Sequence, residues 1–139
     1  MLSLLTVTLF FISAVCPAMA SADVNLIVNG GFETGDHTGW SAFNSAIIDT
    51  TSPHTGTYCA KVDKNSSYEQ TVSLAPNTKY VLTGWAKSEN SAVMTLGVKN
   101  YGGQESFSAT VSAEYQKLTV TFVTNNEPLC GNDLRISSK

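Results

Sequence analysis

Short runs of alternating apolar and polar residues, separated by Gly, Pro, Asn and Ser, constrain the fold of this chain more than any other feature. In residues 79–87, for example, Tyr80 and Leu82 alternate with Thr83 and Trp85. A period of two places successive side chains on opposite faces of a β-strand, whereas a helix would repeat every 3.6 residues. Many short strands with turn residues between them predict an all-β fold, a β-sandwich of the jelly-roll type.

The alternation predicts most of the strands of this sandwich. A short apolar pair, Ile47-Ile48, precedes a turn rich in Thr, Ser, Pro and Gly. Clusters of turn residues separate the later strands. These strands are expected at residues 58–62, 67–74, 79–87, 93–101, 107–111 and 117–123.

The same alternation divides three of the strands into an apolar face for the core and a polar face. In the last of them, for example, Leu118, Val120 and Phe122 oppose Thr119 and Thr121. A sheet with one buried and one solvated face has this pattern. The polar faces of these strands are therefore candidate binding surfaces.

Two aromatic residues, Trp85 and Tyr101, fall on the polar faces among Thr and Lys side chains. The C–H face of a pyranose packs on an aromatic ring, and sugar hydroxyls need hydrogen-bond partners nearby. We therefore expect both rings to be exposed platforms that stack on a saccharide. In the alternative, a β-bulge shifts the parity and places Trp85 in the core. The side chains expected to donate or accept hydrogen bonds are Thr83, Lys87, Lys99, Gln104 and Gln70.

The composition narrows the classes of function. The chain has 139 residues, which suits one domain. Only 14% of them are charged and the net charge is −3, so the chain lacks the basic surface that neutralises nucleic-acid phosphates. A hydrophobic fraction of 42% is too high for intrinsic disorder. We therefore expect a folded, monomeric binding domain with no nucleic-acid partner.

Residues 1–20 differ from the rest of the chain. They contain no charged side chain and end in Ala18-Met19-Ala20, a small-x-small cleavage pattern. This pattern predicts a signal peptide that is cleaved after Ala20. The alternative is an uncleaved anchor, but the apolar stretch is short and is broken by Ser and Thr. We expect residues 21–139 to form a secreted, extracellular domain that does not cross a membrane.

The cysteines leave two interpretations open. Removal of the signal peptide would remove Cys16 and leave Cys59 and Cys130. Two cysteines in an oxidising compartment often pair, and a disulfide that closes so long a loop would add about 4 kcal/mol of stability. A free Cys59 within a strand would be an ordinary core residue.

The sequence as a whole also resembles a known family. The run Asn25–Glu33, followed by Gly39-Trp40, is similar to the opening of carbohydrate-binding modules of the family 4/9, 16 and 22 type. The resemblance covers nearly all of the chain after residue 20. Further similar runs follow in the family's order at residues 54–62, 68–72, 74–87, 96–103 and 115–122.

The resemblance implies a galactose-binding-like β-sandwich that binds a polysaccharide and carries a structural calcium ion. Glu33 matches the acidic residue of the opening motif, and Asp133 matches an aspartate in the C-terminal strand, so both are candidate calcium ligands. Trp40 matches a position at which a tryptophan can flank the sugar site, although it could also plug the core. The segment 123–132 is shorter than the family pattern, which predicts that one C-terminal strand is missing or that the chain is shortened.

Catalysis is not expected from these residues. Glycoside hydrolysis needs two carboxylates, and the acidic residues are scattered over predicted loops and strand ends without an evident pair. The histidines, His37 and His54, lie in polar turns without a nucleophile motif. We predict a non-catalytic domain that binds a polysaccharide or oligosaccharide, and that either targets a carbohydrate-active enzyme or acts alone like a lectin. The alternative is an extracellular structural or adhesion module whose sheet face contacts protein.

Overall fold

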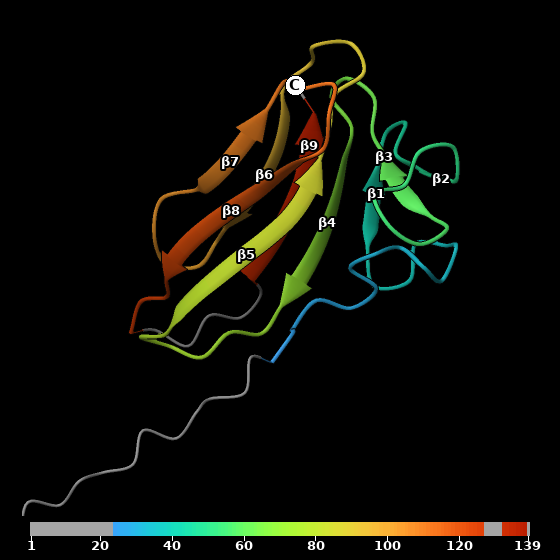
Figure 1. The fold of residues 1–139 in the computed structure, drawn as a ribbon. Coiled ribbons are helices and arrows are strands. Elements are labelled where there is room, and N and C mark those ends of the chain that lie inside the picture. Colours follow the sequence, from blue (N-terminus) through green and yellow to red (C-terminus); the bar gives the residue numbers. More distant parts are fainter. Residues whose placement is uncertain (1–23, 127–131, 139) are drawn as a thin grey trace, which may run out of the picture.

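The computed structural model describes residues 24–126 and 132–138, and the regular elements in these ranges are all β-strands (Figure 1). The prediction of an all-β fold is confirmed. The sequence pattern anticipated β2 to β8 but gave no sign of β1, which is only three residues long. The strands are β1 (Ser41–Phe43), β2 (Ile47–Asp49), β3 (Cys59–Lys61), β4 (Ser67–Val72), β5 (Lys79–Ala86), β6 (Met94–Lys99), β7 (Ser106–Thr110), β8 (Gln116–Val123) and β9 (Asn132–Ser138).

The strands form one large antiparallel sheet and two antiparallel ribbons. The large sheet has the order β1-β4-β9-β6-β7, and the ribbons are β5-β8 and β2-β3. In Figure 1 the β5-β8 ribbon lies in front of the five-stranded sheet, and the β2-β3 ribbon lies to the right, beside β1. β9 pairs with both β4 and β6, so the C-terminal strand that the resemblance implies is present and occupies the centre of the sheet.

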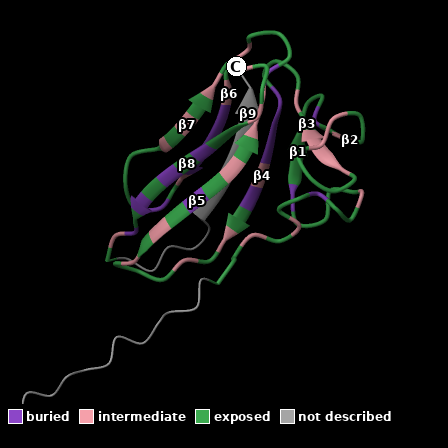
Figure 2. Ribbon diagram, in the orientation of Figure 1, coloured by how far each residue is buried: buried purple, intermediate pink, exposed green. Residues whose placement is uncertain are grey.

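The hydrophobic core lies between the β5-β8 ribbon and the five-stranded sheet. Along β8, buried and exposed residues alternate as the sequence predicts (Figure 2). Each large apolar side chain that is fully buried stabilises the fold by about 1.5–3 kcal/mol. The buried apolar strand residues of this core are Leu82, Leu118, Val120 and Phe122 from the ribbon and Tyr68, Leu96 and Val98 from the sheet.

The middle of β6 is buried on both faces, which the alternation did not predict. Leu96 and Val98 face the core, yet Thr95 and Gly97 on the opposite face are also buried. Phe107, on the neighbouring β7, lies so close that a Cβ added to Gly97 would be 3.1 Å from the Phe107 Cβ. The expected polar face of β6 is therefore mostly covered.

The loop of residues 29–40 is organised by Asn29. Its side-chain amide donates hydrogen bonds to Thr34 Oγ1 (2.7 Å) and to the Thr38 carbonyl (3.2 Å). Its backbone carbonyl accepts a hydrogen bond from Trp40 Nε1 (3.1 Å). Asn29 has a φ of 49°, a left-handed conformation that asparagine adopts more readily than most residues. These bonds hold the Trp40 ring in place.

Trp40 is a core residue. Only 7% of it is exposed, and its ring stacks on Phe32 with a centroid distance of 5.1 Å. Its ring is also in edge contact with Tyr68, at 6.5 Å. Of the two roles considered for Trp40, the structure supports the core plug.

Several sequence-based predictions fall outside the residues that the structure describes. They concern the signal peptide at residues 1–20 and the pairing of Cys59 with Cys130, which both remain predictions. Cys59 itself is half-buried, and burial raises the pKa of its thiol. Within the described ranges, no helix is long and apolar enough to cross a membrane.

Tyr68 gives the first testable prediction. Its side chain is 0% exposed, and among the described residues its hydroxyl has no hydrogen-bond partner. Burying an unpaired hydroxyl costs about 1–3 kcal/mol. We therefore expect Tyr68→Phe to leave the free energy of unfolding unchanged or to raise it, as measured by urea denaturation.

The matched control for this variant is Tyr80→Phe. The Tyr80 hydroxyl accepts a hydrogen bond from the Ala75 N–H (2.9 Å), so its removal should lower the free energy of unfolding by about 0.5–1.5 kcal/mol. An equal loss of stability in both variants would show that the Tyr68 hydroxyl does have a partner.

Asp36 gives a second prediction, on the pH dependence of stability. Its carboxylate accepts hydrogen bonds from Thr38 N (2.9 Å) and Thr34 Oγ1 (2.7 Å). Hydrogen bonds from Thr38 and then Thr34 lower the pKa of Asp36 from 3.8 to about 2. Because the folded-state pKa is the lower one, the carboxylate stabilises the fold above pH 3.8, and this contribution is lost as the pH falls through about 2.

The urea midpoint of the wild type should therefore fall between pH 3.8 and about 2 more steeply than that of Asp36→Asn. Parallel pH profiles for the two proteins would contradict this role of Asp36.

Candidate functional site

Trp85 is exposed, as the alternation predicts. It lies on β5, and 51% of its surface is accessible to solvent. The His54 ring stacks on the indole with a centroid distance of 4.2 Å and an interplanar angle of 14°. Because one indole face is covered by His54, the exposed area belongs mainly to the other face and the ring edge. The alternative in which a bulge buries Trp85 is wrong.

A loop that joins β2 to β3 is attached to the ribbon around this tryptophan. The Tyr115 hydroxyl donates a hydrogen bond to the Ser52 carbonyl (2.6 Å), and Lys87 Nζ donates one to Ser52 Oγ (2.5 Å). The Lys87 ammonium also lies 5.3 Å from the centroid of the Tyr115 ring. Burial raises the pKa of Tyr115, so its hydroxyl remains a donor at neutral pH. We call Ser52, His54, Trp85, Lys87 and Tyr115 the Trp85 cluster.

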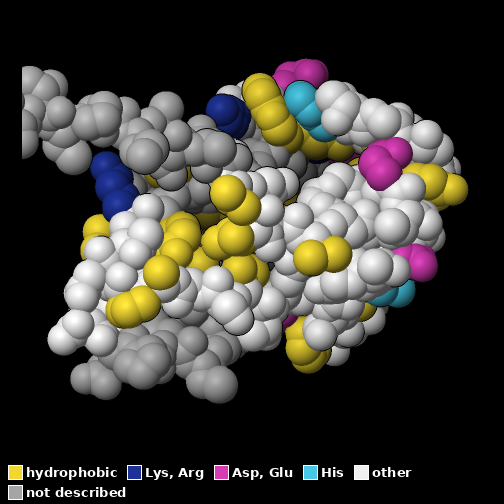
Figure 3. All heavy atoms as spheres, turned by 90° about the horizontal axis from the view of Figure 1, so that it is seen from below, with side chains coloured by type: hydrophobic (Ala, Val, Ile, Leu, Met, Phe, Trp, Pro, Cys, Tyr) yellow, Lys and Arg dark blue, Asp and Glu magenta, His cyan; other side chains and the backbone are white. Residues whose placement is uncertain are grey.

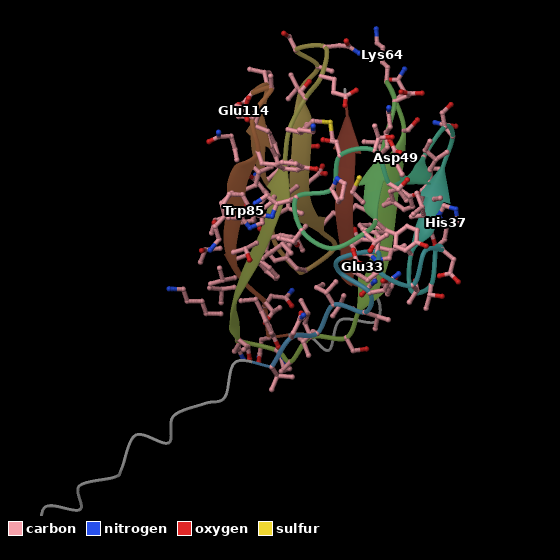
Figure 4. The ribbon with its side chains drawn as sticks, turned by 45° about the vertical axis from the view of Figure 1, so that its right-hand side comes forward. Glu33, His37, Asp49, Lys64, Trp85 and Glu114 are labelled. Atoms are coloured by element: carbon pink, nitrogen blue, oxygen red, sulfur yellow. The ribbon has the colours of Figure 1, made fainter. Side chains whose placement is uncertain are left out.

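A cleft of about 1110 Å³ adjoins the Trp85 cluster. One wall comes from β5, and the other comes from β3 and the residues after it. In Figure 4, Trp85 lies on the ribbon, and Asp49 and Lys64, which line the same cleft, lie to its right. The cleft is as large as pockets that bind small molecules. Its polar lining includes Lys61, Asp63, Thr83, Lys87 and Glu89.

The outward face of the β5-β8 ribbon carries hydroxyl groups beside Trp85. Thr83 lies directly opposite Thr119 in the register, and Trp85 lies opposite Lys117. All four residues are exposed. We call the outward-facing residues of this ribbon the Trp85 face. The prediction that Thr83 shares a polar surface with Trp85 is confirmed, and the Trp85 cluster adds Lys87 to the same surface.

Tyr101 does not belong to this surface, and its prediction as an aromatic platform is wrong. It is only 9% exposed, its ring lies 5.0 Å from that of Phe122, and its hydroxyl donates a hydrogen bond to the Gln104 carbonyl. The cause is Asn100, which has a φ of 59° just after β6 ends. A left-handed residue breaks the alternation, so Tyr101 turns into the core.

Gln70 is also turned away from the Trp85 face and has a structural role. It is 5% exposed, and its side-chain amide accepts from the Val28 N–H (2.8 Å) and donates to the Val28 carbonyl (2.9 Å). This pair of bonds ties the N-terminal segment to β4. Strand parity predicts the face on which a side chain lies, but not whether its polar groups already have hydrogen-bond partners within the fold. The sequence analysis therefore placed Gln70 in the binding site, although its amide is bonded to Val28.

Two further predicted residues lie away from Trp85. Lys99 is on β6, in the five-stranded sheet, and forms an ion pair with Glu69 (3.0 Å). Gln104 follows β6 in an exposed turn next to Tyr101. The structure therefore brings together Trp85, Thr83 and Lys87 but not Lys99 or Gln104.

The sequence analysis missed His54 and Tyr115 as members of the site. Both residues lie in turns, where no periodic pattern indicates the direction of a side chain. Their contacts with Trp85 and Ser52 join segments that are far apart along the chain. A signal was nevertheless present, because both residues lie in runs that resemble the family.

Glu33, the predicted calcium ligand, is hydrogen-bonded to backbone N–H groups of the loop before β3. Its carboxylate accepts hydrogen bonds from the N–H groups of Thr57 (3.0 Å) and Tyr58 (3.1 Å). Calcium requires several oxygen ligands, whereas these N–H dipoles point positive ends at the carboxylate. In the part of the chain that is described, no three His, Cys, Asp or Glu side chains form a metal cluster. The side chain of Asp133 is not described, and calcium binding by Glu33 and Asp133 stays a prediction.

Comparison with known sequences agrees with the fold. A family model described as a carbohydrate binding domain matches residues 24–136. Keratan-sulfate endo-1,4-beta-galactosidase from Sphingobacterium multivorum is 36% identical over 104 residues, which make up 71% of this chain and 24% of that protein. The chain thus spans about a quarter of the length of this relative.

Three solved structures share the fold. A Family 16 Carbohydrate Binding Module-2 has a TM-score of 0.65 and 21% identity, covering 81% of this chain and 86% of that one. TmCBM61 in complex with beta-1,4-galactotriose has a TM-score of 0.55 and 22% identity, covering 82% and 94%. The CBM22-1-CBM22-2 tandem domain of Paenibacillus barcinonensis Xyn10C has a TM-score of 0.62 and 11% identity, covering 88% and 44%.

The link between Glu33 and the loop before β3 gives a third prediction. Gly56 has a φ of +74°, and a Cβ at this position would overlap the Glu33 carboxylate. Gly56→Ala should therefore lower the free energy of unfolding by about 1–3 kcal/mol, because it adds backbone strain and displaces a hydrogen-bonded carboxylate. Urea denaturation measures the change.

Gly31→Ala is the matched control. Its Cβ would meet Glu33 Cγ at 3.4 Å, an ordinary contact, and the backbone of Gly31 is not left-handed. Equal destabilisation by the two alanines would contradict the specific role of Gly56.

Proposed function

The chain belongs to the carbohydrate binding domain family, and we propose that its Trp85 cluster is the place where it binds a saccharide. The observation that carries this proposal is the half-exposed indole of Trp85 beside a cleft of about 1110 Å³. An aromatic face packs against the C–H groups of a pyranose and excludes water from them. The domain binds its ligand without altering it.

Hydrogen-bonding groups surround the ring on which the sugar would stack. Thr83 and Thr119 present hydroxyls on the Trp85 face, and Lys87 presents an ammonium group. Sugar hydroxyls can both donate and accept, so threonine hydroxyls suit them in either sense. The attached loop holds His54 on one side of the indole, which leaves the ring oriented before a ligand arrives. A ring fixed in advance loses less entropy on binding.

We propose a β-linked galactan as the saccharide. Two comparisons support this choice, since one relative is named as an endo-1,4-beta-galactosidase and one structural neighbour is described with beta-1,4-galactotriose. In a larger protein, a domain of this kind would hold a carbohydrate-active enzyme at its substrate. A signal peptide at residues 1–20 would take the protein outside the cell, where such polysaccharides occur.

A fourth prediction tests the site directly. Trp85→Ala should weaken binding of soluble β-1,4-galactan by about thirtyfold, equivalent to about 2 kcal/mol for a central aromatic contact. Affinity electrophoresis and isothermal titration calorimetry measure the change, and circular dichroism checks that the fold is intact.

The matched control is Phe107→Ala. Phe107 is another exposed aromatic residue, 61% accessible, but it lies on β7 of the five-stranded sheet. Loss of binding in Phe107→Ala with no loss in Trp85→Ala would move the site to that sheet. A wild-type protein that binds no glycan but adheres to protein would favour the adhesion module instead.

A further inference from the structure

The Trp85 face is positively charged although the protein is acidic. The protein has a net charge of −3, with 11 acidic and 8 basic residues. Three of the basic residues, Lys79, Lys87 and Lys117, occupy this one face. No acidic residue stands among its positions in the described strands and at their ends. These positions are Lys79, Val81, Thr83, Trp85 and Lys87 along β5, and Tyr115, Lys117, Thr119, Thr121 and Val123 along β8.

The face drawn in Figure 3 separates its visible charged side chains by sign. Lys side chains lie to the left on this face, and the Asp and Glu side chains visible there lie to the right (Figure 3). The left half contains the β5-β8 ribbon in the matching view of Figure 1. Acidic residues flank the strand ends of the Trp85 face, since Glu89 follows Lys87 by two residues and Glu114 directly precedes Tyr115.

Two of the lysines flank the indole. Lys117 is the cross-strand partner of Trp85 in the antiparallel register. Side chains opposite each other in such a pair have Cβ atoms about 4.5–5.5 Å apart. Lys87 follows Trp85 by two residues on the same side, as its contact with the Tyr115 ring shows. A ring stacked on Trp85 would therefore have an ammonium group on each of two sides.

These ammonium groups have no carboxylate partner within the described residues. Lys87 Nζ donates to the neutral Ser52 hydroxyl and lies over the Tyr115 ring. The nearby carboxylates of Asp49 and Glu89 are instead close to Lys61, at 3.7 and 3.8 Å. The positive charge beside Trp85 is thus available to a ligand.

We propose that the saccharide bound at the Trp85 cluster is anionic and carries sulfate or carboxylate groups along its chain. This inference rests on the proposed function, because it assigns the ligand class of the same site. The sugar ring stacks on Trp85, and anionic oxygens accept hydrogen bonds from Lys87 and Lys117. Bonds between charged partners are shorter and stronger than those between neutral groups.

The experiment compares soluble β-1,4-galactan with the same polymer after chemical sulfation, and with the same polymer after oxidation of its C6 hydroxyls to carboxylates. Isothermal titration calorimetry at low and high ionic strength measures each affinity for the wild type. We expect at least one anionic polymer to bind about tenfold more tightly than neutral galactan at low salt, and the preference to shrink at high salt. The stronger of the two anionic arms identifies sulfate or carboxylate as the recognised group.

Variants that each remove one lysine charge show which residues cause the preference for anionic polymers. Lys87→Gln and Lys117→Gln should each reduce the ratio of anionic to neutral affinity by about fivefold. Lys99→Gln removes one charge from the five-stranded sheet and should leave the ratio unchanged. A ratio that falls equally in Lys99→Gln would overturn the assignment to the Trp85 face.

Trp85→Ala separates this inference from the proposed function. If wild-type protein binds all three polymers equally and Trp85→Ala loses them all, the anionic preference is wrong and the saccharide site stands. If Trp85→Ala keeps full affinity for the anionic polymers, the lysines attract any polyanion, and both the inference and the site are wrong. Loss of all binding in Trp85→Ala, together with an anionic preference in the wild type, supports both.

Discussion

The rest of the structure depends on the packing of the β5-β8 ribbon against the five-stranded sheet. In this contact, every second residue of the ribbon is directed into the core. Leu82 on β5 and Val120 on β8 are both buried in this contact. Because strand side chains alternate, burying one set of residues forces the next set outward. The exposure of Trp85 is thus a direct consequence of core packing on the other side of its own strand.

The loop that joins β2 to β3 fixes the orientation of the exposed Trp85 ring. Ser52 receives hydrogen bonds from Lys87 and Tyr115, which directly adjoin the paired ends of β5 and β8. His54 then stacks on the indole. These contacts join the β2-β3 ribbon to the β5-β8 ribbon without backbone pairing between β3 and β5 in the described strands. The space left between them is the cleft, so the same arrangement orients the ring and opens the site beside it.

The two outer faces of the sandwich have different chemistry. On the five-stranded sheet, Lys99 is neutralised by Glu69, and Thr95 and Gly97 are buried. On the Trp85 face, the lysines have no acidic partner among the described residues, and the threonines are exposed. The chain as a whole belongs to the carbohydrate binding domain family, and these differences support the proposal that the β5-β8 ribbon is its saccharide-binding surface.

The sequence by itself determined the all-β fold, the core face of β8 and the exposure of Trp85 beside Thr83. These features depend on strand periodicity, which is local and can be counted along the chain. Only the tertiary structure decided the fate of Tyr101, which one left-handed residue, Asn100, turns into the core. Gln70 and His54 likewise acquired their partners from segments distant in sequence. Periodicity fixes which way a strand residue points, but it contains no information about which distant group will meet that residue.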